Sequence, residues 1–216
     1  MSTEERVAQH FDADAERFDA IYQEGEKSRF ARFIDDRWRG VVQDRLDLAL
    51  EELAPLEGKT VLDVGCGSGR YCHAFAARGA ARVVGVDFAP AMIEIADRLA
   101  REQGVADRCE FHVGTFPDAP PAERFNASTA MGFFDYVEDA GTLIRAMAER
   151  TTDTMIMSFP KAREWRVPLR RLRFAVSRCP LYLYSEQDVR AVLAKAGISN
   201  ERWIDLGRDY VIVASR

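Results

Sequence analysis

Three glycines at alternate positions follow an aspartate in the segment that begins at Asp63. Gly65, Gly67 and Gly69 allow a tight turn and the close approach of a ligand to the backbone. A helix that starts after such a turn presents unpaired N–H groups, which can hold a carboxylate or a phosphate. Asp63 can accept a hydrogen bond from an amino group, and Asp87, which ends the next apolar run, can accept both hydroxyls of a ribose. The pattern therefore predicts a cleft for a nucleoside-bearing cofactor.

The spacing of the glycines distinguishes between two classes of cofactor. The dinucleotide fingerprint G-x-G-x-x-G requires glycine at position 70, where this chain has Arg70. The observed pattern is G-x-G-x-G. Together with the acids at 63 and 87, it favours S-adenosylmethionine over a nicotinamide dinucleotide. A tight glycine turn without a ligand is the structural alternative.

Strand-like and helix-like segments alternate around this loop, which is typical of a parallel sheet with helices on both faces. Ser185 and Asp188 match a capping box, and Gly207 joins two final strands in a predicted antiparallel hairpin. The predicted strands cover residues 60–64, 82–87, 109–113, 125–131, 154–159, 201–206 and 210–214, and the predicted helices cover 69–78, 90–103, 138–149 and 186–196. The fold class is therefore α/β, with a doubly wound, Rossmann-like sheet.

Two segments fall outside the alternation. Residues 4–23 and 29–53 are predicted to form helices, and we expect residues 1–54 to be a helical lid on a core that spans residues 55–216. Residues 161–184 are basic and aromatic and form an insertion after the fifth strand. Clustered arginines would suit carboxylate or phosphate groups on an acceptor, and a solvated basic helix is the alternative.

Charge is unevenly distributed along the chain. Between Lys161 and Arg178, seven basic residues accompany one acidic residue, Glu164, so this stretch carries +6. The whole chain carries −5, which leaves −11 for the remainder. Because so acidic a surface repels phosphates, we do not expect a nucleic-acid partner.

The composition is that of a globular protein. The chain has 216 residues, of which 47% are hydrophobic, and this is enough for one domain with a buried core. No apolar stretch approaches the roughly 18 residues of a membrane span, and the polar first residues lack the apolar segment of a signal peptide. We therefore expect a cytoplasmic protein. The four cysteines lack C-x-x-C spacing, so we expect free thiols and no metal site.

Residues 55–216, with the motif at 61–70 near their start, resemble the class I S-adenosylmethionine-dependent methyltransferases. The resemblance implies a seven-stranded sheet in the order 3-2-1-4-5-7-6, with the seventh strand antiparallel. It also implies that Phe88 and Met92 flank the adenine, although both could instead be core residues. The expected cofactor-binding residues are Asp63, Gly65, Cys66, Gly67, Gly69, Asp87, Phe88, Met92, Thr115, Phe116 and Met131.

The residues after the fourth strand should face the acceptor, because open α/β sheets bind ligands at the carboxyl ends of their strands. Phe133 and Phe134 could line an aromatic pocket or seal the core. Asp135 and Tyr136 are the acid–base candidates, since a carboxylate could take the proton of a hydroxyl or phenol. The alternative for Asp135 is that it caps the helix that follows.

Outside the core, the layout resembles that of the magnesium-protoporphyrin O-methyltransferases. The segments that carry this resemblance are residues 10–12, 20–22, 157–160 and 184–189. In that family a tyrosine that matches Tyr22 serves the active site, so Tyr22 joins Asp135 and Tyr136 as a catalytic candidate. A histidine is expected where this chain has Asp135, and the charge and basicity of an aspartate differ from those of histidine.

The sequence thus predicts methyl transfer from S-adenosylmethionine to the oxygen or nitrogen of a small-molecule acceptor, which could be anionic or aromatic, such as a porphyrin carboxylate. A non-catalytic S-adenosylmethionine-binding or regulatory protein is the main alternative. An RNA methyltransferase is disfavoured by charge, and an NAD-dependent oxidoreductase is disfavoured by Arg70. The sequence does not set the oligomeric state.

Overall fold

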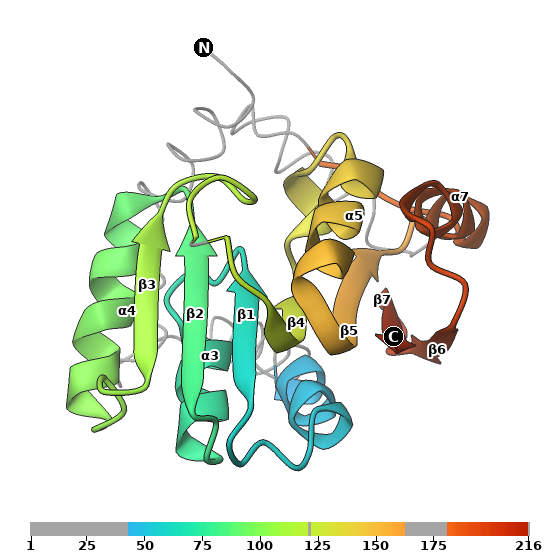
Figure 1. Ribbon diagram of the computed structural model, residues 1–216. Coiled ribbons are helices and arrows are strands. Elements are labelled where there is room, and N and C mark those ends of the chain that lie inside the picture. Colours follow the sequence, from blue (N-terminus) through green and yellow to red (C-terminus); the bar gives the residue numbers. More distant parts are fainter. Residues whose placement is uncertain (1–42, 121, 163–180, 216) are drawn as a thin grey trace, which may run out of the picture.

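The computed structural model describes residues 43–120, 122–162 and 181–215, in which one seven-stranded sheet has the order β3-β2-β1-β4-β5-β7-β6 (Figure 1). The first five strands are mutually parallel, and β7 runs antiparallel to both of its neighbours. The strands are β1 (Thr60–Val64), β2 (Arg82–Asp87), β3 (Cys109–Val113), β4 (Phe125–Ala130), β5 (Thr151–Pro160), β6 (Glu201–Asp205) and β7 (Asp209–Ser215). The expected strand order is confirmed.

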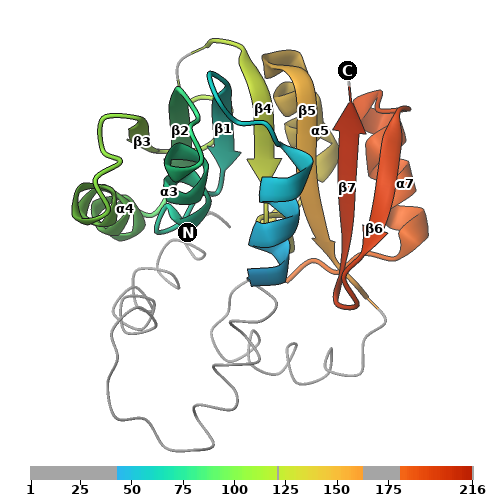
Figure 2. The same ribbon diagram turned by 90° about the horizontal axis from the view of Figure 1, so that it is seen from below.

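Helices cover both faces of the sheet, as Figure 2 shows. A helix over residues 43–52, α3 (Arg70–Ala77) and α4 (Pro90–Glu102) lie on one face. The other face carries α5 (Ala140–Arg150) and α7 (Glu186–Ala196). The doubly wound architecture is therefore confirmed.

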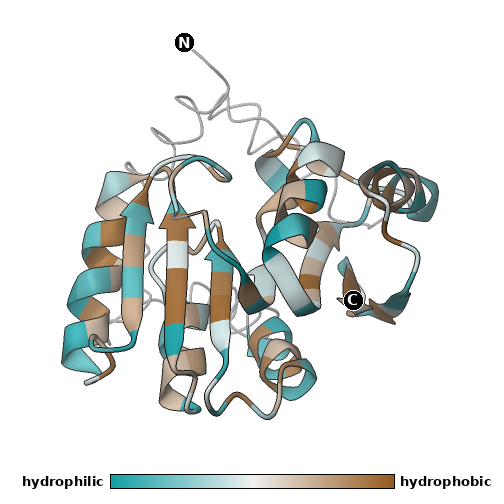
Figure 3. Ribbon diagram, in the orientation of Figure 1, coloured by the Kyte–Doolittle hydropathy of each residue, from teal (hydrophilic) through white to brown (hydrophobic). Residues whose placement is uncertain are grey.

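Alternation along the central strands supplies a core to each face, because successive side chains of a strand point to opposite sides. Val61 packs with the helix of residues 43–52 and α3, whereas Leu62 packs with α5 and β5. In Figure 3, most of β2 is accordingly coloured as hydrophobic, whereas α4 has both hydrophobic and hydrophilic residues. Among the described helices, none has both the length and the apolar character of a membrane span.

Most predicted element boundaries agree with the structure to within two residues. The capping box of Ser185 and Asp188 is present at the start of α7, and Gly207 lies in the hairpin between β6 and β7. The fifth strand differs most, since it begins at Thr151 rather than at residue 154. The described part of the expected lid, residues 43–53, packs on the sheet. The rest of that lid and most of the basic insertion lie outside the described residues.

Candidate cofactor and acceptor cleft

A cleft of ≈ 330 Å³ opens at the carboxyl ends of β1, β2, β3 and β4, where open α/β sheets bind ligands. Its walls come from the loops that follow these four strands and from the first turn of α5. The lining residues are Val64, Gly65, Val86, Asp87, Phe88, Gly114, Thr115, Phe116, Phe133, Tyr136, Val137, Glu138, Asp139, Thr142 and Leu143.

The glycine loop turns tightly between β1 and α3. The N–H groups of Gly65 and Cys66 both donate to the carbonyl of Val86, at 2.8 and 3.0 Å. Gly65 and Gly69 have φ values of +71° and +77°, which disfavour any residue with a side chain. A Cβ atom at Gly69 would lie 2.8 Å from Nε2 of His73. The loop therefore needs glycine both for its conformation and for its close packing.

Asp87, the last residue of β2, lines the cleft. Its Oδ2 accepts a hydrogen bond from the Gly67 N–H at 2.9 Å, and its Oδ1 accepts one from the Ala89 N–H at 3.0 Å. The carboxylate thus holds the glycine loop to the end of β2. It also borders the cleft, where a ribose would approach it.

Asp63 occupies a different position from the one its sequence context suggests. Its Oδ1 accepts a hydrogen bond from Thr129 Oγ1 at 2.6 Å, and its Oδ2 accepts one from Cys72 Sγ at 3.5 Å. The side chain is buried and, within the described residues, does not line the cleft. Burial raises the pKa of this carboxyl to about 7, although the two hydrogen bonds oppose the shift. Asp63 therefore links the end of β1 to β4 and α3.

Replacement of Asp63 by asparagine should reduce the pH dependence of stability in the ligand-free protein. The folded-state pKa of about 7 lies above the ordinary aspartate value of 3.8, so between pH 4 and 7 the folded chain holds a proton that the unfolded chain has lost. The contribution of Asp63 to the free energy of unfolding therefore falls as pH rises through this window. We expect the dependence of the melting temperature on pH to differ in slope between the wild type and D63N from pH 4 to 7. Parallel curves would contradict the shift.

Some of the other predicted cofactor residues line the cleft and some do not. Gly65, Phe88, Thr115 and Phe116 line the cleft beside Asp87. The remaining predicted residues are not among those that line the cleft, and all but the half-buried Gly67 are buried. They are Cys66, Gly67, Gly69, Met92 and Met131, of which Met92 packs with Ala89 and Phe88.

The two phenylalanines after β4 have separate positions. Phe133 lines the cleft, whereas Phe134 is fully buried and stacks on Phe159 with ring centroids 4.8 Å apart. Tyr136 also lines the cleft, whereas Asp135, in the short 3-10 helix η1 (Phe134–Tyr136), is 5% exposed and is not among the lining residues. Helix α5 is capped instead by Asp139, whose Oδ1 accepts from the Thr142 N–H. The capping interpretation of Asp135 is therefore wrong.

The segment that follows the basic insertion holds this acceptor-side loop. The Tyr182 N–H donates to the carbonyl of Asp135 at 2.8 Å. The Tyr184 hydroxyl lies 3.3 Å from the carbonyl of Phe134 and 3.4 Å from that of Val137. Burial raises the pKa of the Tyr184 hydroxyl well above its usual range, so the group remains a donor. Backbone and side chain thus fix the loop in place.

The structure adds cleft residues from the start of α5 that sequence reasoning missed. Glu138, Asp139, Thr142 and Leu143 all border the cleft. The position of this helix in the sequence could have indicated these residues. A helix that follows a parallel strand begins at the carboxyl edge of the sheet, where the cleft lies. Tyr22, the third catalytic candidate, lies outside the described residues.

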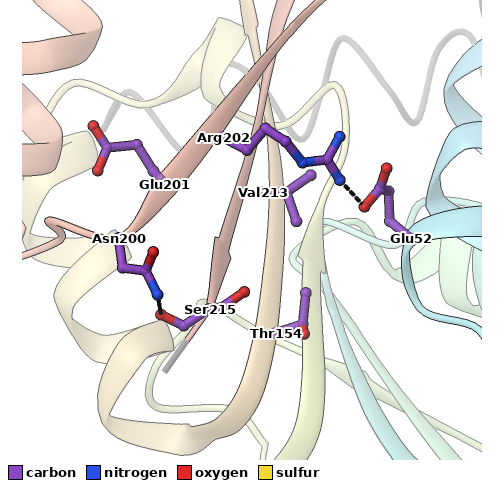
Figure 4. Close-up of a pocket in the computed structure, with 7 residues that line it drawn as sticks. All are labelled: Glu52, Thr154, Asn200, Glu201, Arg202, Val213 and Ser215. Carbon is purple, nitrogen blue, oxygen red and sulfur yellow. Dashed lines mark hydrogen bonds and ion pairs between the residues drawn. The ribbon is translucent and has the colours of Figure 1, made fainter.

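A second hollow, of ≈ 300 Å³, lies among the residues drawn in Figure 4, at the opposite end of the sheet. Thr154 near the start of β5 and Ser215 at the end of β7 border it. Arg202 and Glu52 pair with each other across one side. The lining contains no glycine loop and no aromatic ring. Of these two hollows, the cleft at the carboxyl edge is therefore the one whose glycine loop, carboxylate and aromatic rings suit a nucleoside-bearing cofactor.

Comparison with known proteins gives matches along much of the chain. Residues 61–154 match a family model described as a methyltransferase domain. The ubiquinone biosynthesis O-methyltransferase of Neisseria meningitidis serogroup C is 36% identical over 135 residues, which are 58% of this chain and 56% of that relative. The tRNA U34 carboxymethyltransferase of Methylococcus capsulatus is 29% identical over 187 residues, which are 81% of this chain and 54% of that relative. The chain spans about half the length of these curated relatives.

A solved structure matches the whole fold. Magnesium protoporphyrin IX methyltransferase from Synechocystis PCC 6803, crystallised with bound SAH, superposes with a TM-score of 0.80 at 20% identity, and the match covers 100% of both chains. At this identity the likeness shows the fold alone. Residues 61–154 match a methyltransferase domain, and the strand order and the whole-chain superposition show the Rossmann-like fold of methyltransferases.

Proposed function

We propose that this protein transfers a methyl group from S-adenosylmethionine to a hydroxyl oxygen of a small aromatic acceptor. The observation that carries the proposal is the cleft itself, which joins the glycine loop and Asp87 to an apolar wall that contains Phe133 and Tyr136. One part of this cleft suits a nucleoside and the other suits a planar apolar compound. The names of the O-methyltransferase relatives support the same reaction class.

The residues present fit the proposed cofactor. Gly65 and the Phe133 ring pack against each other and both line the cleft, and Asp87 offers a carboxylate edge for a ribose. Phe88 and Phe116 provide apolar contacts for a base. Bound S-adenosylmethionine would supply a methyl group that is already activated as a sulfonium. The protein then needs mainly to align two ligands and to exclude water, which can lower the barrier by several kcal/mol.

The acceptor side supplies the groups that could handle a proton. A phenol ionises with a pKa near 10, so a base that takes its proton would help the oxygen to attack. Tyr136 borders the cleft and Asp135 lies next to it in η1. We assign the acid–base role to Asp135 with Tyr136, and to Tyr22 a contact with the acceptor. A porphyrin carboxylate would arrive ionised and would need no base.

Replacement of Asp135 by asparagine should lower kcat by about 100-fold and leave the affinity for S-adenosylhomocysteine unchanged. The amide keeps the shape of the side chain but cannot take a proton. The matched control is Asp139→Asn, which alters a nearby acid that lines the cleft and caps α5. A steady-state assay with both variants tests the role. A D135N enzyme with wild-type kcat would exclude Asp135 as the base.

Methyl transfer itself is tested with S-adenosylmethionine that carries a labelled methyl group and with three acceptor sets: phenols and catechols, porphyrin carboxylic acids, and tRNA. We expect label in a phenolic product and formation of S-adenosylhomocysteine. Label in tRNA alone would instead favour a nucleic-acid acceptor, as in the tRNA-modifying relative. S-adenosylhomocysteine binding without transfer to any acceptor would favour a non-catalytic binding protein. Titration with NAD and with S-adenosylhomocysteine tests the oxidoreductase alternative, which requires that NAD bind in preference to S-adenosylhomocysteine.

A further inference from the structure

We propose that Phe133 forms the wall of the cleft that faces the sulfonium of the cofactor, and that its ring makes the site prefer S-adenosylmethionine to S-adenosylhomocysteine. This inference rests on the proposed function. It assigns to one aromatic side chain the ability to distinguish the charged methyl donor from its neutral product.

The position of the ring is set by its contact with the glycine loop. A Cβ atom added to Gly65 would lie 2.4 Å from Cδ2 of Phe133 and 3.0 Å from its Cγ. The ring therefore packs directly on the Gly65 backbone, in the space that the missing side chain leaves. Both residues also line the cleft. Any ligand that passes along the loop at Gly65 must consequently meet this ring.

The strand order indicates which part of the ligand reaches Gly65. The loops at the carboxyl edge follow the order β3, β2, β1, β4, which places Thr115, Asp87, Gly65 and Phe133 in that sequence across the sheet. If Asp87 holds the ribose and Thr115 borders the base, the ligand atoms on the far side of the ribose lie over Gly65. In S-adenosylmethionine that side of the ribose carries the sulfur. Phe133 follows β4 and stands next in line.

The ring is also well supported. Phe133 contacts Phe134 edge to face at a centroid distance of 5.4 Å, and Phe134 stacks on Phe159 at 4.8 Å. Phe159 in turn meets the ring of Tyr184, whose hydroxyl lies close to the Phe134 carbonyl. This row of rings joins the cleft wall to the core. A wall fixed in this way can contribute to binding without first having to be ordered.

An aromatic ring attracts a cation but has no comparable attraction for a neutral thioether. The sulfur is positively charged in S-adenosylmethionine and neutral in S-adenosylhomocysteine. The ring should therefore favour the donor over the product, whereas apolar contacts elsewhere in the cleft should affect both ligands equally. A ring at this position would also promote release of the product.

The test compares the affinities of both ligands in Phe133→Leu and Phe88→Leu, measured by calorimetry without acceptor. Leucine keeps apolar bulk in place of the ring, and Phe88 is the matched control because it is a half-buried ring in the same cleft. We expect F133L to lose about 2- to 30-fold in affinity for S-adenosylmethionine and less than 2-fold for S-adenosylhomocysteine. F88L should weaken both ligands by the same factor.

Equal loss of both ligands in F133L, or no loss of either, would overturn the inference. Thermal unfolding without ligand shows whether each variant is folded. If wild-type protein binds neither ligand, the proposed function fails. If it binds both and F133L leaves their ratio unchanged, only the role of Phe133 fails.

Discussion

Replacement of Asp87 by alanine is expected to weaken the binding of S-adenosylhomocysteine by about 100-fold or more. The carboxylate accepts hydrogen bonds from the N–H groups of Gly67 and Ala89, and it borders the cleft where a ribose would lie. Its loss therefore removes a charged acceptor for the ligand and the anchor of the glycine loop together. Isothermal titration calorimetry of the folded variant measures the effect.

Two further variants separate these contributions. Asp87→Asn keeps one side-chain oxygen as an acceptor and should bind with intermediate affinity. Glu138→Ala removes an exposed acid from the rim of the same cleft and should change affinity by less than about 3-fold. If D87A binds as tightly as the Glu138 variant, Asp87 does not contact the ligand. Circular dichroism and thermal unfolding without ligand confirm that each variant is folded.

The cofactor side of the cleft was the part most open to sequence reasoning, because its signals are local. The glycines must turn the chain within a few residues, and Asp87 is the last residue of a strand. These features depend on backbone conformation and on strand ends, which short motifs determine. The order of the strands, in contrast, came from family resemblance, since no local pattern specifies which strands are neighbours.

Side-chain direction explains where the sequence interpretation was incomplete. Asp63 shares the period of Val61 along β1, so both side chains point to the face covered by α3. Asp63 therefore reaches Cys72 rather than the cleft. Phe133 and Phe134 lie beyond the end of β4, where strand alternation no longer applies, and Phe134 packs in the core whereas Phe133 lines the cleft. Only the packed structure shows which of the two faces the ligand.

Long-range pairs could not have been found in the sequence. Arg45 and Asp209 are 164 residues apart, yet Arg45 Nη2 lies 2.7 Å from Asp209 Oδ2 and Arg45 Nε lies 3.0 Å from the same oxygen. The Asp209 side chain is 1% exposed and that of Arg45 is 15% exposed. Burial opposes the charge on Arg45, but Asp209 and then Asp135 outweigh it and raise its pKa. The pair fastens the helix of residues 43–52 to the first residue of β7.

Replacement of Asp209 by alanine should therefore lower the free energy of unfolding by about 3–5 kcal/mol, because it leaves a buried guanidinium without its carboxylate. The effect should reach the acceptor loop, since Arg45 Nη1 lies 3.0 Å from the position that a Cβ of Gly132 would take at the end of β4. Urea denaturation measures the loss. The double variant Arg45→Met with Asp209→Ala should recover part of it, because both charges are then absent.

The matched control for this pair is Arg202→Ala, which breaks the ion pair between Arg202 and Glu52. That pair also joins the helix of residues 43–52 to the sheet, but Arg202 is exposed to solvent. Water screens an exposed ion pair and hydrates the partner left behind, so its loss should cost far less than that of the buried pair. Equal losses in D209A and R202A would show that the helix is held by apolar packing, through Leu46, Ala49 and Leu53, rather than by the buried charges.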